Sequence, residues 1–132
     1  MANQYSVAVN NARLDAIETA AGASAKLRIY TGSVPANCAA AATGTMLVEM
    51  ALPADWMNAA SAASKTKLGT WTGTAAATGT AGYYRIVDNA GTTCHIQGTA
   101  GMSGTDLILD NSSIATSQSV TINTFQINAA NT

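Results

Sequence analysis

The chain has 132 residues, of which 48% are apolar, 5% aromatic and only 10% charged, and its formal net charge is −1. This length suits a single domain, and six scattered Lys and Arg residues do not form the basic stripe that nucleic-acid binding needs. No apolar run approaches the ~20 residues that span a bilayer, and the N-terminus lacks the basic and apolar regions of a signal peptide. We therefore expect synthesis in a cytoplasm, where Cys38 and Cys94 stay reduced. So few charges suit a chain that works within an assembly, although a small soluble domain rich in Ala and Thr remains the alternative.

The first predicted element is a helix over residues 6–22. Ser6 can cap its N-terminus and Gly22 can end it. Four apolar residues fall on one face at helical spacing, with Asn10 interrupting that face: Val7, Leu14, Ile17 and Ala21. Because the opposite face is not basic, we expect this helix to dock on the protein core rather than on a membrane.

A change to alternating apolar and polar residues after Gly22 predicts strands. Residues 26–30 place Leu27 and Ile29 on one face of a half-buried strand. A long loop over 32–45 and a second strand over 46–52 follow. The segment 53–64 fits either a short helix or a loop, and Trp56 is expected to anchor it to the core.

Five further strands are predicted in the second half of the chain, over residues 67–73, 82–88, 93–98, 106–110 and 119–128. The Asp-Asn-Ala-Gly run at 88–91 predicts a hairpin turn, and residues 101–104 form the next turn. We interpret the Thr, Gly and Ala residues at 73–81 as a mobile loop. The apolar phase reverses between Ile122 and Phe125, which predicts a β-bulge near 123–124 or a strand that changes sheets.

These elements predict a mainly β fold. An antiparallel, jelly-roll-like β-sandwich of about seven to eight strands accommodates many short strands with frequent turns. We expect one domain over 1–132, with an N-terminal arm and helix at 1–22 and a β core at 26–128.

Side chains able to do chemistry are few and scattered. His95 is the one histidine, and nothing like a nucleophile elbow accompanies it. On a straight strand it lies opposite in phase to Cys94 and Ile96. Asp106 and Asp110 can share a face and join a calcium site, although solvated strand-edge carboxylates are commoner. We therefore expect no enzyme activity, catalytic residue, cofactor or metal.

One aromatic group invites a binding interpretation. Trp71 and the tyrosine pair Tyr83-Tyr84 could form an aromatic platform that binds carbohydrate. The simpler interpretation is that one tyrosine packs inward while its neighbour faces outward.

Several strings of the sequence resemble a family of small structural proteins from tailed bacteriophages. They are AKLRIYTGSVP at 25–35, LPADWM at 52–57, GYYRIVD at 82–88 and TCHIQG at 93–98. The likeness extends over nearly the whole chain. It implies a capsid cement or decoration protein, a jelly roll bound outside the icosahedral shell of the virion. The implied partner is the major capsid protein.

A cement role requires surface anchors, and a dimer across a shell symmetry axis would serve it well. Large aromatic side chains and Arg usually anchor interfaces, whereas Ala and Ser are depleted there. The candidate anchors are Tyr5, Arg28, Tyr30, Trp56 and Tyr84, with burial in the core as the alternative for Trp56. Two other functions stay open: a tail-fibre or receptor-binding module that binds host glycans, and a small hydrolase that uses His95.

Overall fold

The computed structural model describes residues 3–129, which form an N-terminal helix followed by ten strands. The elements in chain order are α1 (Val7–Ala21), β1 (Lys26–Tyr30), β2 (Met46–Ala51), β3 (Ser64–Thr66), β4 (Thr72–Thr74), β5 (Gly79–Thr80), β6 (Tyr83–Val87), β7 (Cys94–Gly101), β8 (Leu107–Leu109), β9 (Ser113–Ile114) and β10 (Ser119–Asn128). In this part of the chain one sheet has the order β2-β1-β6-β7-β8-β10-β3, with β4 also paired to β10, and β5 pairs with β9. The predicted mainly β class is confirmed, and the curled sheet is consistent with a jelly-roll-like sandwich.

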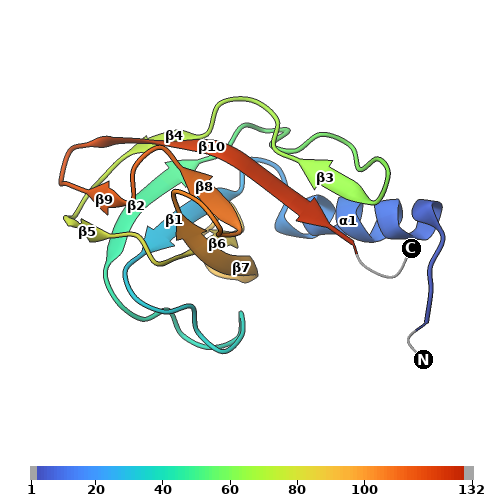
Figure 1. Ribbon diagram of the computed structural model, residues 1–132, viewed down its shortest axis with the longest axis horizontal. Coiled ribbons are helices and arrows are strands. Elements are labelled where there is room, and N and C mark those ends of the chain that lie inside the picture. The colour runs from blue at the N-terminus through green and yellow to red at the C-terminus, as the bar shows by residue number, and fades with distance from the viewer. Residues whose placement is uncertain (1–2, 130–132) are drawn as a thin grey trace.

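The sheet curls far enough for β4 to reach β2, although the two strands share no ladder (Figure 1). The Ala76 N–H, just beyond β4, donates to the Leu47 carbonyl at 2.8 Å. A Cβ added to Gly73 would lie only 2.8 Å from the Met50 Cβ. Glycine is therefore required where the backbone of β4 crosses the side chains of β2.

The predicted helix is confirmed almost to the residue. Ser6 is extended and its Oγ accepts from the Val9 N–H at 3.1 Å, while Gly22 has φ of 87° and donates its N–H to the Glu18 carbonyl. The prediction was wrong about Val7, which is 49% exposed. The residue that interrupts the apolar face, Asn10, is fully buried instead.

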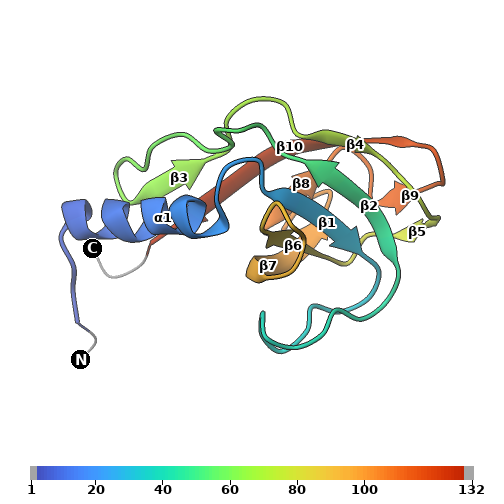
Figure 2. The same ribbon diagram turned by 180° about the vertical axis from the view of Figure 1, so that it is seen from behind.

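Helix α1 lies outside the curled body, beside β3 and the C-terminal end of β10 (Figures 1 and 2). The segment 53–64 forms no helix and contacts α1. Within it Trp56 is fully buried, as expected, and its Nε1–H donates to the Gly22 carbonyl at 3.0 Å. Trp56 thus fixes the C-terminal end of α1, just before the chain enters β1.

The structure also differs from the predicted elements over residues 64–81. A single strand over 67–73 was wrong, because β3 and β4 flank an irregular stretch in which Gly69 has φ of 77°. The segment 73–81, which was expected to be a loop, contains the end of β4 and all of β5, and its Ala75 and Ala81 are buried. Small side chains make this segment look featureless in sequence, yet they allow its close approach to β2.

The bulge predicted in the last strand is confirmed. The pairing of β10 with β8 shifts register between Ile122 and Thr124, which brings both Ile122 and Phe125 into the core. Phe125 contacts the rings of Trp71 and Tyr84, with centroid separations of 5.4 and 5.5 Å. The core is therefore centred on large aromatics, although the chain has few of them.

Candidate partner-binding surfaces

The charged side chains are almost all engaged within the chain itself. Every Lys and Arg has an intramolecular partner, and ion pairs join six residues: Lys26 and Arg28 with Glu49, and Lys65 with Asp15 and Glu18. The Arg28 Nε lies 2.6 Å from the Glu49 Oε2. Burial opposes the charge of Arg28, but Glu49 outweighs it and raises the pKa of Arg28. A partner of this protein therefore meets few free charges.

Residues 31–45, here named the covering loop, lie over the outer face of β6. Three side chains from the sheet hold this loop through its backbone. The Arg85 Nη2 donates to the Asn37 and Ala40 carbonyls at 3.3 and 2.7 Å, and the Gln97 Nε2 donates to the Pro35 carbonyl at 2.8 Å. The Tyr83 hydroxyl donates to one Thr43 backbone group and accepts from the other. Strand β6 is consequently buried on both faces.

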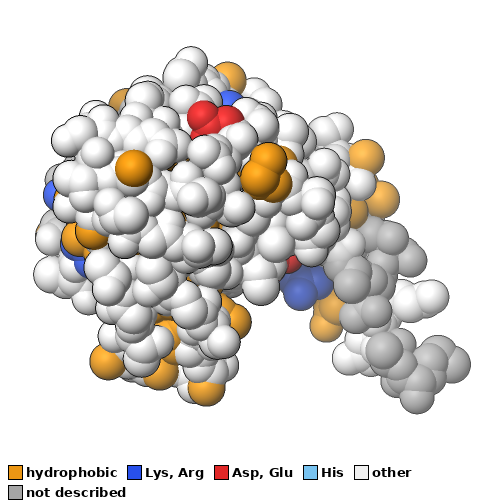
Figure 3. Space-filling model, turned by 60° about the vertical axis from the view of Figure 1, so that its left-hand side comes forward, with side chains coloured by type: hydrophobic (Ala, Val, Ile, Leu, Met, Phe, Trp, Pro, Cys, Tyr) orange, Lys and Arg blue, Asp and Glu red, His pale blue; other side chains and the backbone are white. Residues whose placement is uncertain are grey.

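The covering loop carries the first apolar surface, named here the loop surface. Its exposed side chains are Val34, Ala36, Ala39, Ala41 and Ala42, together with Met46 at the start of β2. Figure 3 shows apolar side chains gathered at the lower end of the body, where Figure 1 places this loop. Val34 and Met46 are 36% and 39% exposed, so both can make contacts without unfolding.

A second exposed apolar group, named here the arm surface, lies at the start of α1. It consists of Tyr5, Val7 and Val9, which are 38%, 49% and 45% exposed. The Arg13 guanidinium carbon lies 4.9 Å from the Tyr5 ring centroid, which holds the ring against the helix. The helix start and the covering loop lie well apart in the molecule (Figure 2).

The five predicted interface anchors differ in whether their side chains reach the surface. Trp56 is fully buried, Tyr84 is 2% exposed and Tyr30 is 8% exposed, so these three leave the set of surface anchors. Tyr84 packs in the core, where burial raises its pKa well above the usual value. Tyr30 stacks on Tyr83 at 4.9 Å, beside the covering loop. Tyr5 and Arg28 alone retain accessible area, and Arg28 is already paired.

The side chains that were candidates for a catalytic, metal or carbohydrate site do not come together in the structure. In residues 3–129 no group of three or more His, Cys, Asp or Glu side chains could hold a metal ion. The Asp106 carboxylate accepts from the Thr99 N–H and hydroxyl at 2.9 and 3.0 Å. Trp71 and both tyrosines of the suggested carbohydrate platform are buried, which contradicts that interpretation.

A cavity of about 360 Å³ opens between β7 and the end of β10. Tyr84, Ile96 and Phe125 contribute apolar walls, while Gln97 and Asp106 contribute polar atoms. The Gln97 side-chain amide already bonds Pro35 and Arg85, and the Asp106 carboxylate already accepts from Thr99. The described lining includes no Lys, Arg or His.

Few features of the sequence indicate the two apolar surfaces. Val34 stands among turn residues, where an isolated apolar side chain could have been noticed. Val7 fits the buried face of α1 by spacing, yet it is exposed. Among the described residues no helix has the length and apolar content needed to cross a membrane. Comparison with known proteins found no matching family model, no matching curated protein and no matching solved structure.

Proposed function

We propose that this chain is a non-enzymatic structural protein of a tailed bacteriophage, which decorates and stabilises the outer surface of the capsid. The observation that carries this proposal is the presence of two separate apolar surfaces on a molecule whose positive charges are all engaged internally. The likeness of its sequence strings to phage cement proteins supports the same function. Synthesis in the host cytoplasm and final residence on the virion follow from it.

Cementing works by joining neighbouring copies of the major capsid protein. The loop surface would contact one subunit and the arm surface a second one. Each contact need bury only a modest area, on the order of 800 Å² per partner. Because the second contact forms at high effective concentration once the first has formed, two weak contacts on one body can give an overall affinity about 10² to 10⁴ times higher. Pairing of two copies across a shell symmetry axis would link further contacts into the same assembly.

The test adds the purified protein to capsids that lack it, and measures the saturating copy number and the temperature at which the shells open. Val34→Asp and Val7→Asp each place a charge on one apolar surface. Met102→Asp is the matched control, because Met102 is 57% exposed and belongs to neither surface. We expect stoichiometric binding and a raised opening temperature for the native chain and the control, and loss of the stabilisation in both other variants.

Two other results would contradict the capsid function and favour an alternative one. Attachment to host cells or glycans without capsid affinity would indicate the tail-fibre or receptor-binding module. A hydrolytic activity that His95→Ala abolishes, in a variant that still folds, would indicate an enzyme.

A further inference from the structure

A β-bulge at His95 turns Cys94 away from the core. In the pairing of β6 with β7, Ile86 lies opposite Ile96 whereas the next residue, Val87, lies opposite Cys94. His95 is therefore an extra residue in β7, and the alternation of faces breaks there. Ile96 packs against the core, while Cys94 lines the outer cavity with Val87. A straight strand would have put Cys94 on the same face as Ile96.

The cavity that receives Cys94 also receives Cys38. It has a volume of about 290 Å³ and lies between the covering loop and the strands β1, β6 and β7. Cys38 belongs to the covering loop, 56 positions earlier in the sequence, between the two carbonyls that Arg85 binds. Arg85 is buried, so it holds the loop against the sheet beside the cavity that both cysteines line.

Both cysteines are free and half-buried. Burial and the adjacent Cys38 thiol raise the pKa of the Cys94 thiol to about 12, and the positive charge of Arg85 acts in the opposite direction. Cys94 is therefore a poor first nucleophile, since the thiolate is the reacting species. Once Cys38 is no longer a thiol, one cause of this raised pKa is removed.

We propose that Cys38 and Cys94 form a dithiol pair that closes to an intramolecular disulfide on reaction with a small-molecule disulfide, fastening the covering loop to β7. The Cys38 thiolate attacks one sulfur of the small disulfide and releases one thiol. The Cys94 thiolate then attacks the Cys38 sulfur of the mixed disulfide and releases the second thiol. Two protein thiols are oxidised, one small disulfide is reduced to two thiols, and the two protons end on the released thiols.

Closure has a measurable effect on folding. It joins residues 56 positions apart, which restricts the unfolded chain, and the expected rise in Tm is on the order of 10 °C. It also fixes the loop that carries the loop surface. This chemistry is independent of the proposed capsid function.

The test incubates the full chain with oxidised glutathione at mildly alkaline pH, then measures intact mass, disulfide-linked peptides and Tm. We expect the mass to fall by two hydrogens, a peptide pair joining Cys38 to Cys94, and a raised Tm. Cys38→Ser and Cys94→Ser serve as controls that should gain no Tm increase. Circular dichroism checks that each variant folds.

Three outcomes would overturn the pairing. They are a stable mixed disulfide on the native chain, disulfide-linked dimers in place of the internal bond, and thiols that react only after denaturation. Each would show that the two sulfurs do not meet in the folded protein.

Discussion

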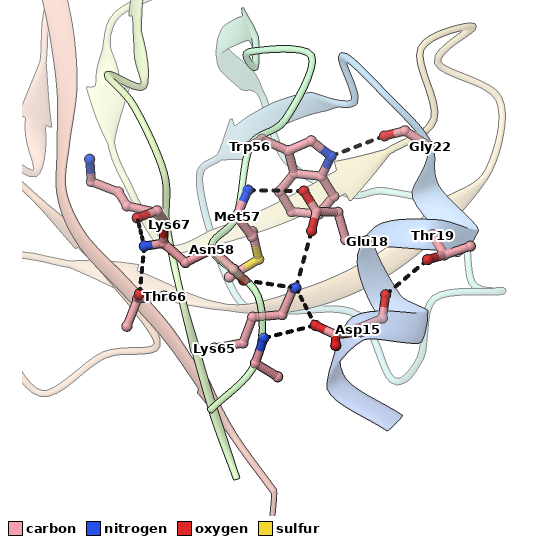
Figure 4. A network of polar contacts seen from close by, with 11 residues as sticks. Asp15, Glu18, Thr19, Gly22, Trp56, Met57, Asn58, Lys65, Thr66 and Lys67 are labelled. Atoms are coloured by element: carbon pink, nitrogen blue, oxygen red, sulfur yellow. Dashed lines mark hydrogen bonds and ion pairs between the residues drawn. The ribbon is translucent and has the colours of Figure 1, made fainter. Parts of the chain in front are cut away.

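Replacement of Lys65 by Met should destabilise the protein by removing the charge that joins α1 to β3. The Lys65 side chain is 1% exposed, and its Nζ lies 2.7 Å from the Asp15 Oδ1, 3.1 Å from the Glu18 Oε1 and 2.9 Å from the Asn58 carbonyl (Figure 4). Met has nearly the same length and flexibility but donates nothing. The substitution therefore tests the charge and its hydrogen bonds rather than the packing.

The magnitude follows from the surroundings of the two carboxylates. A hydrogen bond to a charged group contributes about 1.5 to 3 kcal/mol, and breaking a fully buried pair costs about 3 to 5 kcal/mol. Here the Asp15 and Glu18 side chains are 46% and 21% exposed, so water replaces part of what Lys65 supplied. We expect a loss of about 2 to 3 kcal/mol at neutral pH, which corresponds to a fall in Tm of about 8 to 12 °C.

The pH dependence gives this prediction a second signature. Lys65, and then the Ala60 N–H, lower the pKa of Asp15 below its unfolded value. A lowered acid pKa contributes stability above the unfolded pKa of about 3.9, and this contribution is lost as the pH falls through the folded pKa. Burial opposes the charge of Lys65, but Asp15 and Glu18 outweigh it and raise its pKa, so its contribution is lost at strongly alkaline pH. The difference between the native chain and Lys65→Met should therefore shrink at both extremes.

Urea unfolding followed by circular dichroism at several pH values measures this difference. Lys67→Met is the matched control, because Lys67 is only half-buried and its Nζ donates to the Gly69 carbonyl alone. We expect the control to change the free energy of unfolding by less than about 0.5 kcal/mol. Equal stability of the two variants at neutral pH, or an unchanged effect of Lys65→Met in acid, would show that the ion pairs of Lys65 do not stabilise the fold.

Three further substitutions test other parts of the fold. Tyr83→Phe should cost about 1 to 1.5 kcal/mol and speed hydrogen exchange at the Thr43 amide, because its hydroxyl bonds both Thr43 backbone groups; unchanged exchange would contradict this. Gly82→Ala should cost about 3 kcal/mol or more in urea unfolding, since the new Cβ would lie 1.9 Å from the Gly32 carbonyl oxygen; a native midpoint would contradict it. Ser6→Ala should remove the cap of α1 and cost about 1 kcal/mol in thermal unfolding; an unchanged Tm would contradict it.

Features set by neighbouring residues could be predicted from the sequence. The helix ends at Ser6 and Gly22 depend on local capping. The turn at 88–91 depends on Gly91, whose φ is 77°, and on the Asp88 carboxylate, which accepts from the Thr92 N–H at 2.8 Å. The bulge of β10 could be found because its apolar residues reverse phase within one strand.

Features set by distant backbone atoms could not be predicted. Arg85 and Gln97 hold the covering loop through carbonyl oxygens, and every residue has one, so no side-chain pattern marks the contact. The burial of Tyr30 depends on that loop. The bulge at His95 depends on the register between β6 and β7, so the sequence around Cys94 carries no sign that it faces Cys38.

Three of the five predicted interface anchors proved to be buried, and the reason is physical. Large aromatics such as Trp56 and Tyr84 are the side chains that gain most from burial, so in a chain with few of them the core takes nearly all. The exposed apolar positions are then left to residues such as Val7, Val9 and Val34, which are ordinary core types by composition.

The function proposed for these surfaces depends on how firmly α1 is fixed to the curled body. Beyond Lys65, backbone N–H groups of Met57, Ala60 and Ala63 donate to the Glu18, Asp15 and Asn11 side chains at 2.9 to 3.0 Å. The three acceptors recur at helical spacing, so these bonds lie along one side of α1. Two contacts made from one body gain most affinity when their separation is nearly fixed and matches the two sites, because a loose connection spreads the second contact over many positions. The polar network that stabilises α1 is therefore also what would let two apolar surfaces, each too small to bind tightly alone, act as a single bridge.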